Sequence, residues 1–73
     1  MNKFTAYIER DAETGLLVGM VPGVPCAHTQ AETLDELSIN LKEVLELCLG
    51  ELNKSEIKKL PQFVGIQQLE IAI

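Results

Sequence analysis

Carboxylates are the side chains in this chain most obviously suited to hydrolytic chemistry. Hydrolysis assisted by two metal ions needs several carboxylates that converge on ions about 4 Å apart. Glu9, Asp11 and Glu13 fall around one turn, and Glu70 lies far along the chain. Because these spacings do not bring the acids to one point, we predict no catalytic site, no metal site and no enzyme. The other acids considered fall on the surface of a predicted helix: Asp35, Glu36, Glu43, Glu46 and Glu51.

His28 and Cys26 could form a nucleophile pair, since alternate residues of a strand point the same way. No third group is evident to orient the histidine, so we interpret His28 as an exposed edge or interface residue. One His and two Cys are too few for a four-ligand zinc site, and we predict no cofactor. Two cysteines 22 residues apart, without a signal peptide, do not indicate a secreted disulfide scaffold. Cys48 is predicted to be a small buried hydrophobe.

The stretch from Thr33 to Leu52 has the pattern of an amphipathic helix. Thr33 and Glu36 have the spacing of a capping box, which marks a helix start. Ile39 falls on the opposite side from the apolar stripe and is a candidate interface residue. The stripe is expected to pack on the rest of the fold, and its members are Leu34, Leu37, Leu41, Val44, Leu45, Cys48 and Leu52.

Four segments have the composition of strands. Residues 4–9 alternate between two faces, and residues 16–21 are apolar on both faces, as in a strand inside a sheet. Residues 26–30 form a short polar strand suited to an edge, and residues 69–73 alternate like a closing strand. A short second helix is compatible with residues 55–60, before Pro61.

These elements predict an α+β fold with the element order β-β-β-α-β. Short connections make the first three strands an antiparallel meander, and a right-handed helical crossover places the fourth beside the first. The predicted sheet order is therefore 3-2-1-4. One helix covers only one face of this sheet. The other face, which carries Tyr7 and half of the second strand, is where we expect a subunit or partner.

The chain has 73 residues and a formal net charge of −5. This length predicts one domain, residues 1–73, which is small enough that a homo-oligomer (dimer or tetramer) would supplement its core. An acidic surface repels phosphate, so we expect a basic protein partner and no direct nucleic-acid ligand. No apolar run approaches the ~20 residues of a membrane span, so we expect no membrane partner and a cytoplasmic location.

Taken in order, several runs of the chain resemble HicB-family antitoxins, and the resemblance covers nearly the whole sequence. Cys26 is a departure, because a Gly is common there in the family. The closing Leu69–Ile71 matches more weakly. The runs that carry the resemblance are Ala6–Asp11 (AYIERD), Glu13–Gly15 (ETG), Val21–Pro25 (VPGVP), His28–Leu37 (HTQAETLDEL) and Asn40–Leu45 (NLKEVL).

The resemblance implies a partial ribonuclease H-like fold and a role in neutralising a small basic HicA-like toxin, itself a ribonuclease. The chain resembles the short form of the family, which lacks the DNA-binding extension of longer members. No toxin-contact residue is carried over from the family. The partner-binding candidates come from charge and position alone: Glu9, Asp11, Glu13, Tyr7, His28 and Ile39. The alternative is a regulatory or degenerate nuclease-like domain that acts alone.

Overall fold

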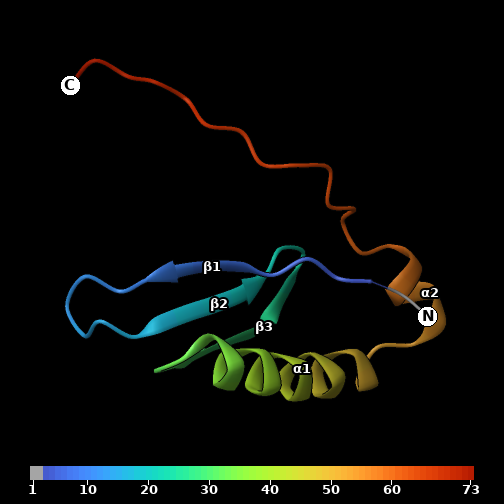
Figure 1. The fold of residues 1–73 in the computed structure, drawn as a ribbon. Helices are drawn as coiled ribbons and strands as arrows, with labels where there is room; N and C mark the ends of the chain where they lie inside the picture. The colour runs from blue at the N-terminus through green and yellow to red at the C-terminus, as the bar shows by residue number, and fades with distance from the viewer. Residues whose placement is uncertain (1–2) are drawn as a thin grey trace.

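The computed structural model describes residues 3–73 and contains a three-stranded sheet with one long helix against it (Figure 1). A second, short helix follows the first, and the remaining residues run away from the sheet. The predicted α+β class is confirmed. In chain order the elements are β1 (Tyr7–Arg10), β2 (Leu17–Val21), β3 (Val24–Ala31), α1 (Leu34–Gly50) and α2 (Lys54–Lys58).

The sheet is an antiparallel meander in the order β1-β2-β3. The predicted central position of β2 and edge position of β3 are confirmed. The predicted 3-2-1-4 order is wrong, because residues 61–73 form no strand and leave β1 as the other edge. The alternation of residues 69–73 is compatible with extended backbone, but a strand also needs a neighbour with which to share hydrogen bonds. Pattern alone does not supply that neighbour.

Helix α1 begins where the capping signal predicts. The Thr33 side chain accepts a hydrogen bond of 3.2 Å from the Glu36 backbone N–H, which satisfies one of the free donors of the first turn. The fully reciprocal capping box forms at α2, between Asn53 and Glu56, with bonds of 2.8 and 3.1 Å. The predicted second helix is thus confirmed, at residues 54–58 rather than 55–60.

The core lies between α1 and one face of the sheet. Leu37 and Leu41 are buried, as the apolar stripe predicts, whereas Leu34 at the start of the helix is 58% exposed. Two clusters make up this core. One contains Leu17, Ala31, Leu37 and Leu41, and the other contains Val21, Val24 and Ala27 with Val44, Leu45, Cys48 and Leu60 packed against it.

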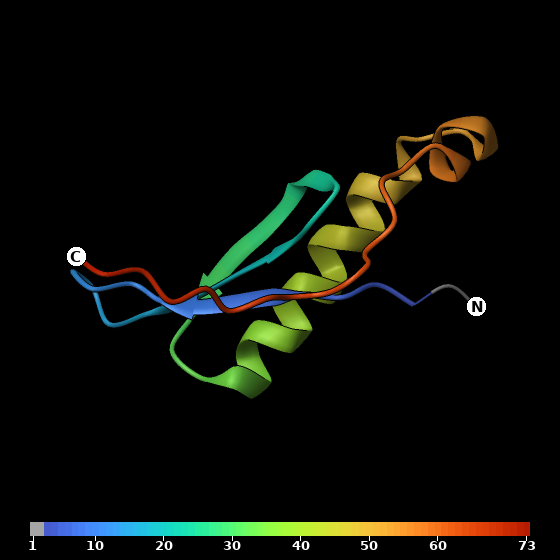
Figure 2. The ribbon, with the colours of Figure 1, turned by 90° about the horizontal axis from the view of Figure 1, so that it is seen from above.

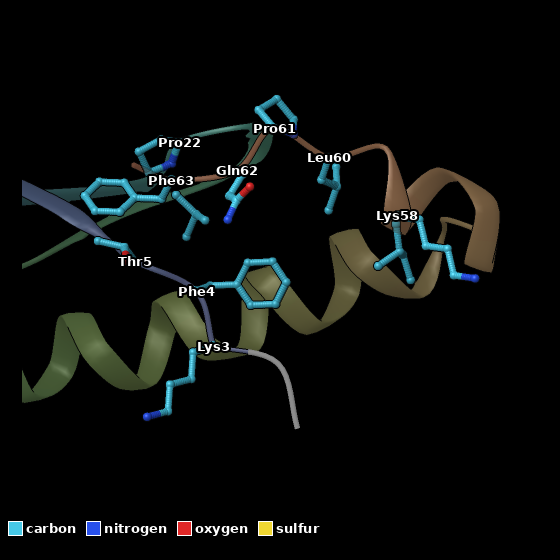
Figure 3. Close-up of a pocket in the computed structure, with 11 residues that line it drawn as sticks. Lys3, Phe4, Thr5, Pro22, Lys58, Leu60, Pro61, Gln62 and Phe63 are labelled. Atoms are coloured by element: carbon cyan, nitrogen blue, oxygen red, sulfur yellow. The ribbon is translucent and has the colours of Figure 1, made fainter. Parts of the chain in front are cut away.

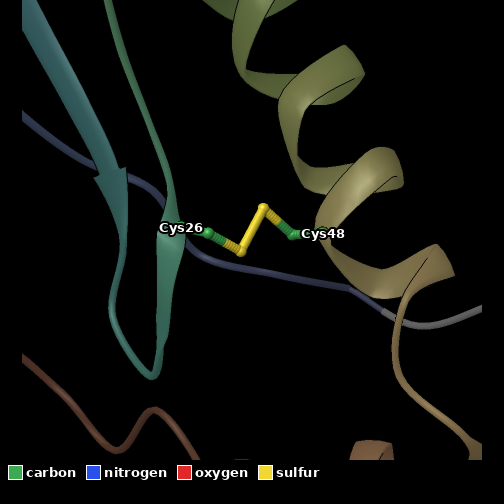
Figure 4. Close-up of a disulfide and its surroundings, with 2 residues drawn as sticks. All are labelled: Cys26 and Cys48. Carbon is green, nitrogen blue, oxygen red and sulfur yellow. A yellow bond between two sulfur atoms is a disulfide. The ribbon is translucent and has the colours of Figure 1, made fainter.

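A disulfide bond between Cys26 and Cys48 joins β3 to the second half of α1 (Figure 4). The two Cα atoms are 6.2 Å apart, within the usual range for a disulfide. The prediction of Cys48 as merely a buried hydrophobe is therefore wrong. The helical period correctly directs Cys48 toward the sheet, but it contains no information about which residue of β3 lies opposite.

Within residues 3–73, no helix has both the length and the apolar character needed to cross a membrane.

Candidate functional site

The sheet face that points away from α1 carries a row of exposed side chains across all three strands. The strand register pairs Tyr7 with Met20, and Met20 with His28. Tyr7 is 43% and Met20 45% exposed, and His28 is exposed as well. Ile8, next along β1, points to the α1 side instead, where it lines a groove with helix residues. The adjacent row on the open face contains Glu9, Val18 and Gln30.

The turn between β1 and β2 is closed by Asp11. Its backbone N–H donates to the Leu16 carbonyl at 2.8 Å, and its own carbonyl accepts from Gly15 at 2.9 Å. Gly15 has φ +76°, in the left-handed region that glycine adopts without strain. The Thr14 hydroxyl donates to the Asp11 carboxylate at 2.7 Å, and this bond is the main reason that the pKa of Asp11 is lowered. Asp11 is therefore an ionised residue with a structural role in the turn.

Glu9 and Glu13 are more available to a partner than Asp11 is. Glu9 is exposed and accepts a long hydrogen bond, 3.3 Å, from the Tyr7 hydroxyl. Glu13 is exposed in the turn. The Arg10 guanidinium donates to the Gly15 carbonyl at 2.8 Å, which holds one positive charge beside the turn. With Asp11, three carboxylates outnumber this single cation, so the hairpin end is negative.

The structure brings together five of the six candidate residues that the sequence indicated. Tyr7, His28 and Glu9 lie on the open sheet face, and the turn with Asp11 and Glu13 adjoins it. Ile39 does not join them. It is 61% exposed on α1 and lies two positions from both Leu37 and Leu41, on the side of the helix away from the sheet.

Met20 is the residue of the row Tyr7–Met20–His28 that sequence analysis did not single out. It is the last but one residue of β2, a segment whose apolar character on both faces predicted an interior strand. The apolar character of β2 on both faces was the signal that could have identified Met20. With only one long helix among the described residues 3–73, one apolar face of β2 had to remain uncovered, and Met20 lies on that face.

The open face has the chemistry of a contact surface. No group of three or more His, Cys, Asp or Glu within residues 3–73 is arranged to hold a metal ion. The Cys26 sulfur is bonded to Cys48, so it is not available as the thiolate of a Cys–His pair. What remains is an exposed row with one aromatic ring and one thioether beside a negative hairpin end.

Two cavities lie away from this face. The larger, about 520 Å³, is formed by residues 3–5, the β2–β3 turn, α2 and the residues that follow it (Figure 3). Its wall is polar and apolar in nearly equal parts, with Phe4 and Phe63 prominent, and neither a carboxylate nor a histidine lines it. The second, about 400 Å³, is a groove between β1 and α1. Lys42 and Glu46 line this groove from α1, among mostly apolar residues.

Comparison with known proteins finds relatives that match nearly the whole chain. A protein of Synechocystis called "UPF0150 protein ssr1258" is 44% identical over 73 residues, which is 97% of this chain and 100% of the relative. A UPF0150 protein of Thermotoga maritima is 50% identical over 68 residues, 93% of this chain and 88% of the relative. One from Archaeoglobus fulgidus is 43% identical, with 94% of each chain covered. No protein-family model matches the chain, and no solved structure matches it significantly.

Proposed function

The chain belongs to the UPF0150 family, and from this premise we propose that it is an antitoxin that binds and neutralises a small, basic HicA-like ribonuclease toxin. The family name states no activity, so the proposal depends on the surface of the molecule and on the sequence resemblance to short HicB-family antitoxins.

The observation that carries this proposal is the position of the exposed row Tyr7–Met20–His28 beside a negative hairpin end. Tyr and Met are enriched at the centres of protein interfaces, where their side chains are removed from water. Charged groups at the rim of an interface select a partner of opposite charge. A surface with this composition, on a chain of net charge −5, fits a basic protein.

Neutralisation follows from competition for one surface. A toxin that cleaves RNA needs a positive surface to hold the phosphate backbone. The acids Glu9 and Glu13 offer carboxylates to the same lysines and arginines, while Tyr7 and Met20 contribute apolar contacts that phosphate lacks. Direct binding therefore blocks the RNA site without any chemistry by this protein. The same acidic surface leads us to propose that the chain does not bind nucleic acid directly.

The experiment that tests this function is co-purification with the product of the adjacent reading frame, followed by an RNA-protection assay. The wild-type protein should protect RNA from that toxin. Met20→Lys, which places a cation in the exposed row, should lose protection. Ile39→Lys is the matched control, because Ile39 is also apolar and exposed but lies on the far side of α1.

Three outcomes contradict the proposal. The first is failure of the wild type to protect RNA in a stable mixture with its neighbouring gene product. The second is equal protection by the Met20→Lys and Ile39→Lys variants, which would move the binding surface elsewhere. The third is cleavage of RNA by the purified protein alone with magnesium or manganese, which would favour the alternative of a nuclease-like domain.

A further inference from the structure

The outer edge of β1 is unpaired. β1 shares hydrogen bonds with β2 on one side, and no other strand within residues 3–73 occupies its second side. Such an edge presents free N–H and C=O groups and is a template for a further strand. All four residues of β1 are exposed.

The groove between β1 and α1 lies directly beside this edge. Ile8 and Phe4 line it from the sheet side and are 41% and 37% exposed, although they point toward the helix. Leu41 and Leu45 line it from α1. The helix packs over β2 and β3 and makes little contact with β1, which leaves a mostly apolar hollow of about 400 Å³ beside β1. A strand added to the β1 edge would place alternate side chains in that hollow.

Residues 61–73 form the one long segment in the described structure without regular structure. Leu69, Ile71 and Ile73 alternate with Gln68, Glu70 and Ala72, which gives the segment one apolar side. Leu69 is 75% and Ile71 72% exposed. An alternating apolar segment in contact with water lacks the burial that would stabilise it.

The segment leaves the molecule on the side of the sheet opposite α1, away from the groove (Figure 1). Seen from above, it runs along the line of β1 without joining it (Figure 2). Its start is held by Pro61, whose ring carbons come within 3.2–3.3 Å of the position where a Cβ would stand on Gly23 in the β2–β3 turn. This contact directs the segment away from the groove of its own chain.

We propose that residues 64–73 of one copy dock as a fourth strand on the β1 edge of a second copy. Leu69 and Ile71 then enter the groove between β1 and α1, and the exchange is reciprocal about a twofold axis. This is an interface between copies and differs from the fourth strand within one chain, which the structure does not contain.

The size of the resulting interface is that of a stable dimer. Each copy contributes the ten residues 64–73 and the ten residues that line its groove. Together these give about 20 residues a side, which corresponds to a standard interface of roughly 1,600 Å² in total. A twofold exchange also closes on itself, so it pairs both free edges and leaves no open end for further copies.

The experiment measures the mass of the full chain in solution by analytical ultracentrifugation over a range of concentrations. The wild type should have twice the chain mass of 8.1 kDa. The double variant Leu69→Lys/Ile71→Lys places two ammonium groups in the apolar groove and should have the mass of a single chain. The control Gln68→Lys/Ala72→Lys introduces the same two charges on the other side of the segment, and should remain a dimer.

Circular dichroism shows whether each variant keeps the helical content of the wild type. A wild type that remains a monomer at all concentrations overturns the proposal. If Leu69→Lys/Ile71→Lys also lowers the melting temperature of that monomer, the segment packs against its own chain instead. A dimer that persists equally in both double variants also overturns it, because the interface then lies elsewhere. None of these outcomes depends on a toxin, so the proposed antitoxin activity is tested separately.

Discussion

Gly19 of β2 and Leu41 of α1 are in such close contact that a Cβ added to Gly19 would stand 2.7 Å from the Leu41 Cδ1 atom. The same added carbon would stand 3.2 Å from the Leu37 Cδ2 atom. Glycine at this position therefore lets α1 approach the central strand, and both leucines are buried as a result. The contact joins α1 to the central strand of the sheet.

Gly19→Val should destabilise the protein by about 1–3 kcal/mol, because extra methyl groups in a packed core force neighbouring side chains to move. Thermal or chemical unfolding followed by circular dichroism measures this. Gly50→Ala is the control. Nothing lies within 4 Å of a Cβ at Gly50, at the end of α1, so that variant should gain stability, by roughly 0.5–1 kcal/mol at most.

A double-mutant cycle would show whether Leu41 is the cause. Leu41→Ala alone should cost about 2–5 kcal/mol as a buried leucine lost to a cavity. In that background Gly19→Val should cost clearly less, because the added methyl groups enter the space that Leu41 left. Strictly additive costs would show that the clash with Leu41 is not what opposes a side chain at position 19.

The Asp11–Thr14 contact makes a prediction about pH. Because the Thr14 hydroxyl lowers the pKa of Asp11 from its ordinary value of 3.8, the ionised carboxylate favours the folded state. That contribution is fully present above pH 3.8 and is lost as the pH falls through the lowered pKa. In Thr14→Val the pKa of Asp11 should rise toward its ordinary value, as measured by NMR titration of the side-chain carboxyl carbon. An unchanged pKa would mean that the backbone N–H groups of the turn, not the hydroxyl, hold it down.

Local signals in the sequence predicted the elements well. The Thr33 cap located the start of α1, Gly15 marked the first turn, and the apolar character of residues 16–21 predicted a central strand. Each of these depends on interactions within a few residues of the chain. The uncovered sheet face was also predictable, because one helix covers only one side of a sheet.

Contacts between distant parts of the chain were less predictable. The alternation of Leu69 and Ile71 indicated an extended segment but could not tell whether its neighbour is β1 of the same chain, water or another molecule. The Cys26–Cys48 bond depends on the stagger of β3 against α1, and no periodicity within either element determines that stagger. In the same way, Ile39 could be placed on the far side of the helix, but its separation from Tyr7 and His28 required the packed fold.

The Cys26–Cys48 bond should contribute to stability through the loop that it closes. With 22 residues of separation, the restriction of the unfolded chain corresponds to about 3 kcal/mol. Adding a reductant such as TCEP should therefore lower the midpoint of guanidinium unfolding, and the free energy of unfolding should fall by about this amount. The double variant Cys26→Ser/Cys48→Ala should unfold at the same denaturant concentration with and without reductant. A wild type that is insensitive to reductant would show that the bond adds nothing to stability.

The last prediction concerns the rate at which the proposed toxin is captured. Glu9 and Glu13 are exposed at the hairpin end, whereas Asp11 is held by Thr14 within the turn. The double variant Glu9→Lys/Glu13→Lys therefore reverses the field of this end while keeping the residue that closes the turn. Electrostatic steering acts on association, so the on-rate for a basic toxin should fall by tenfold or more at low salt, and the difference should shrink as salt is added. The off-rate should change less, because the contacts of Tyr7 and Met20 are apolar and are not screened. Stopped-flow or surface-based kinetics at several ionic strengths would measure both rates.

An unchanged on-rate in a correctly folded variant would place the toxin away from this end of the sheet. A large change in the off-rate alone would mean that these acids form close ion pairs in the complex and do not act at a distance.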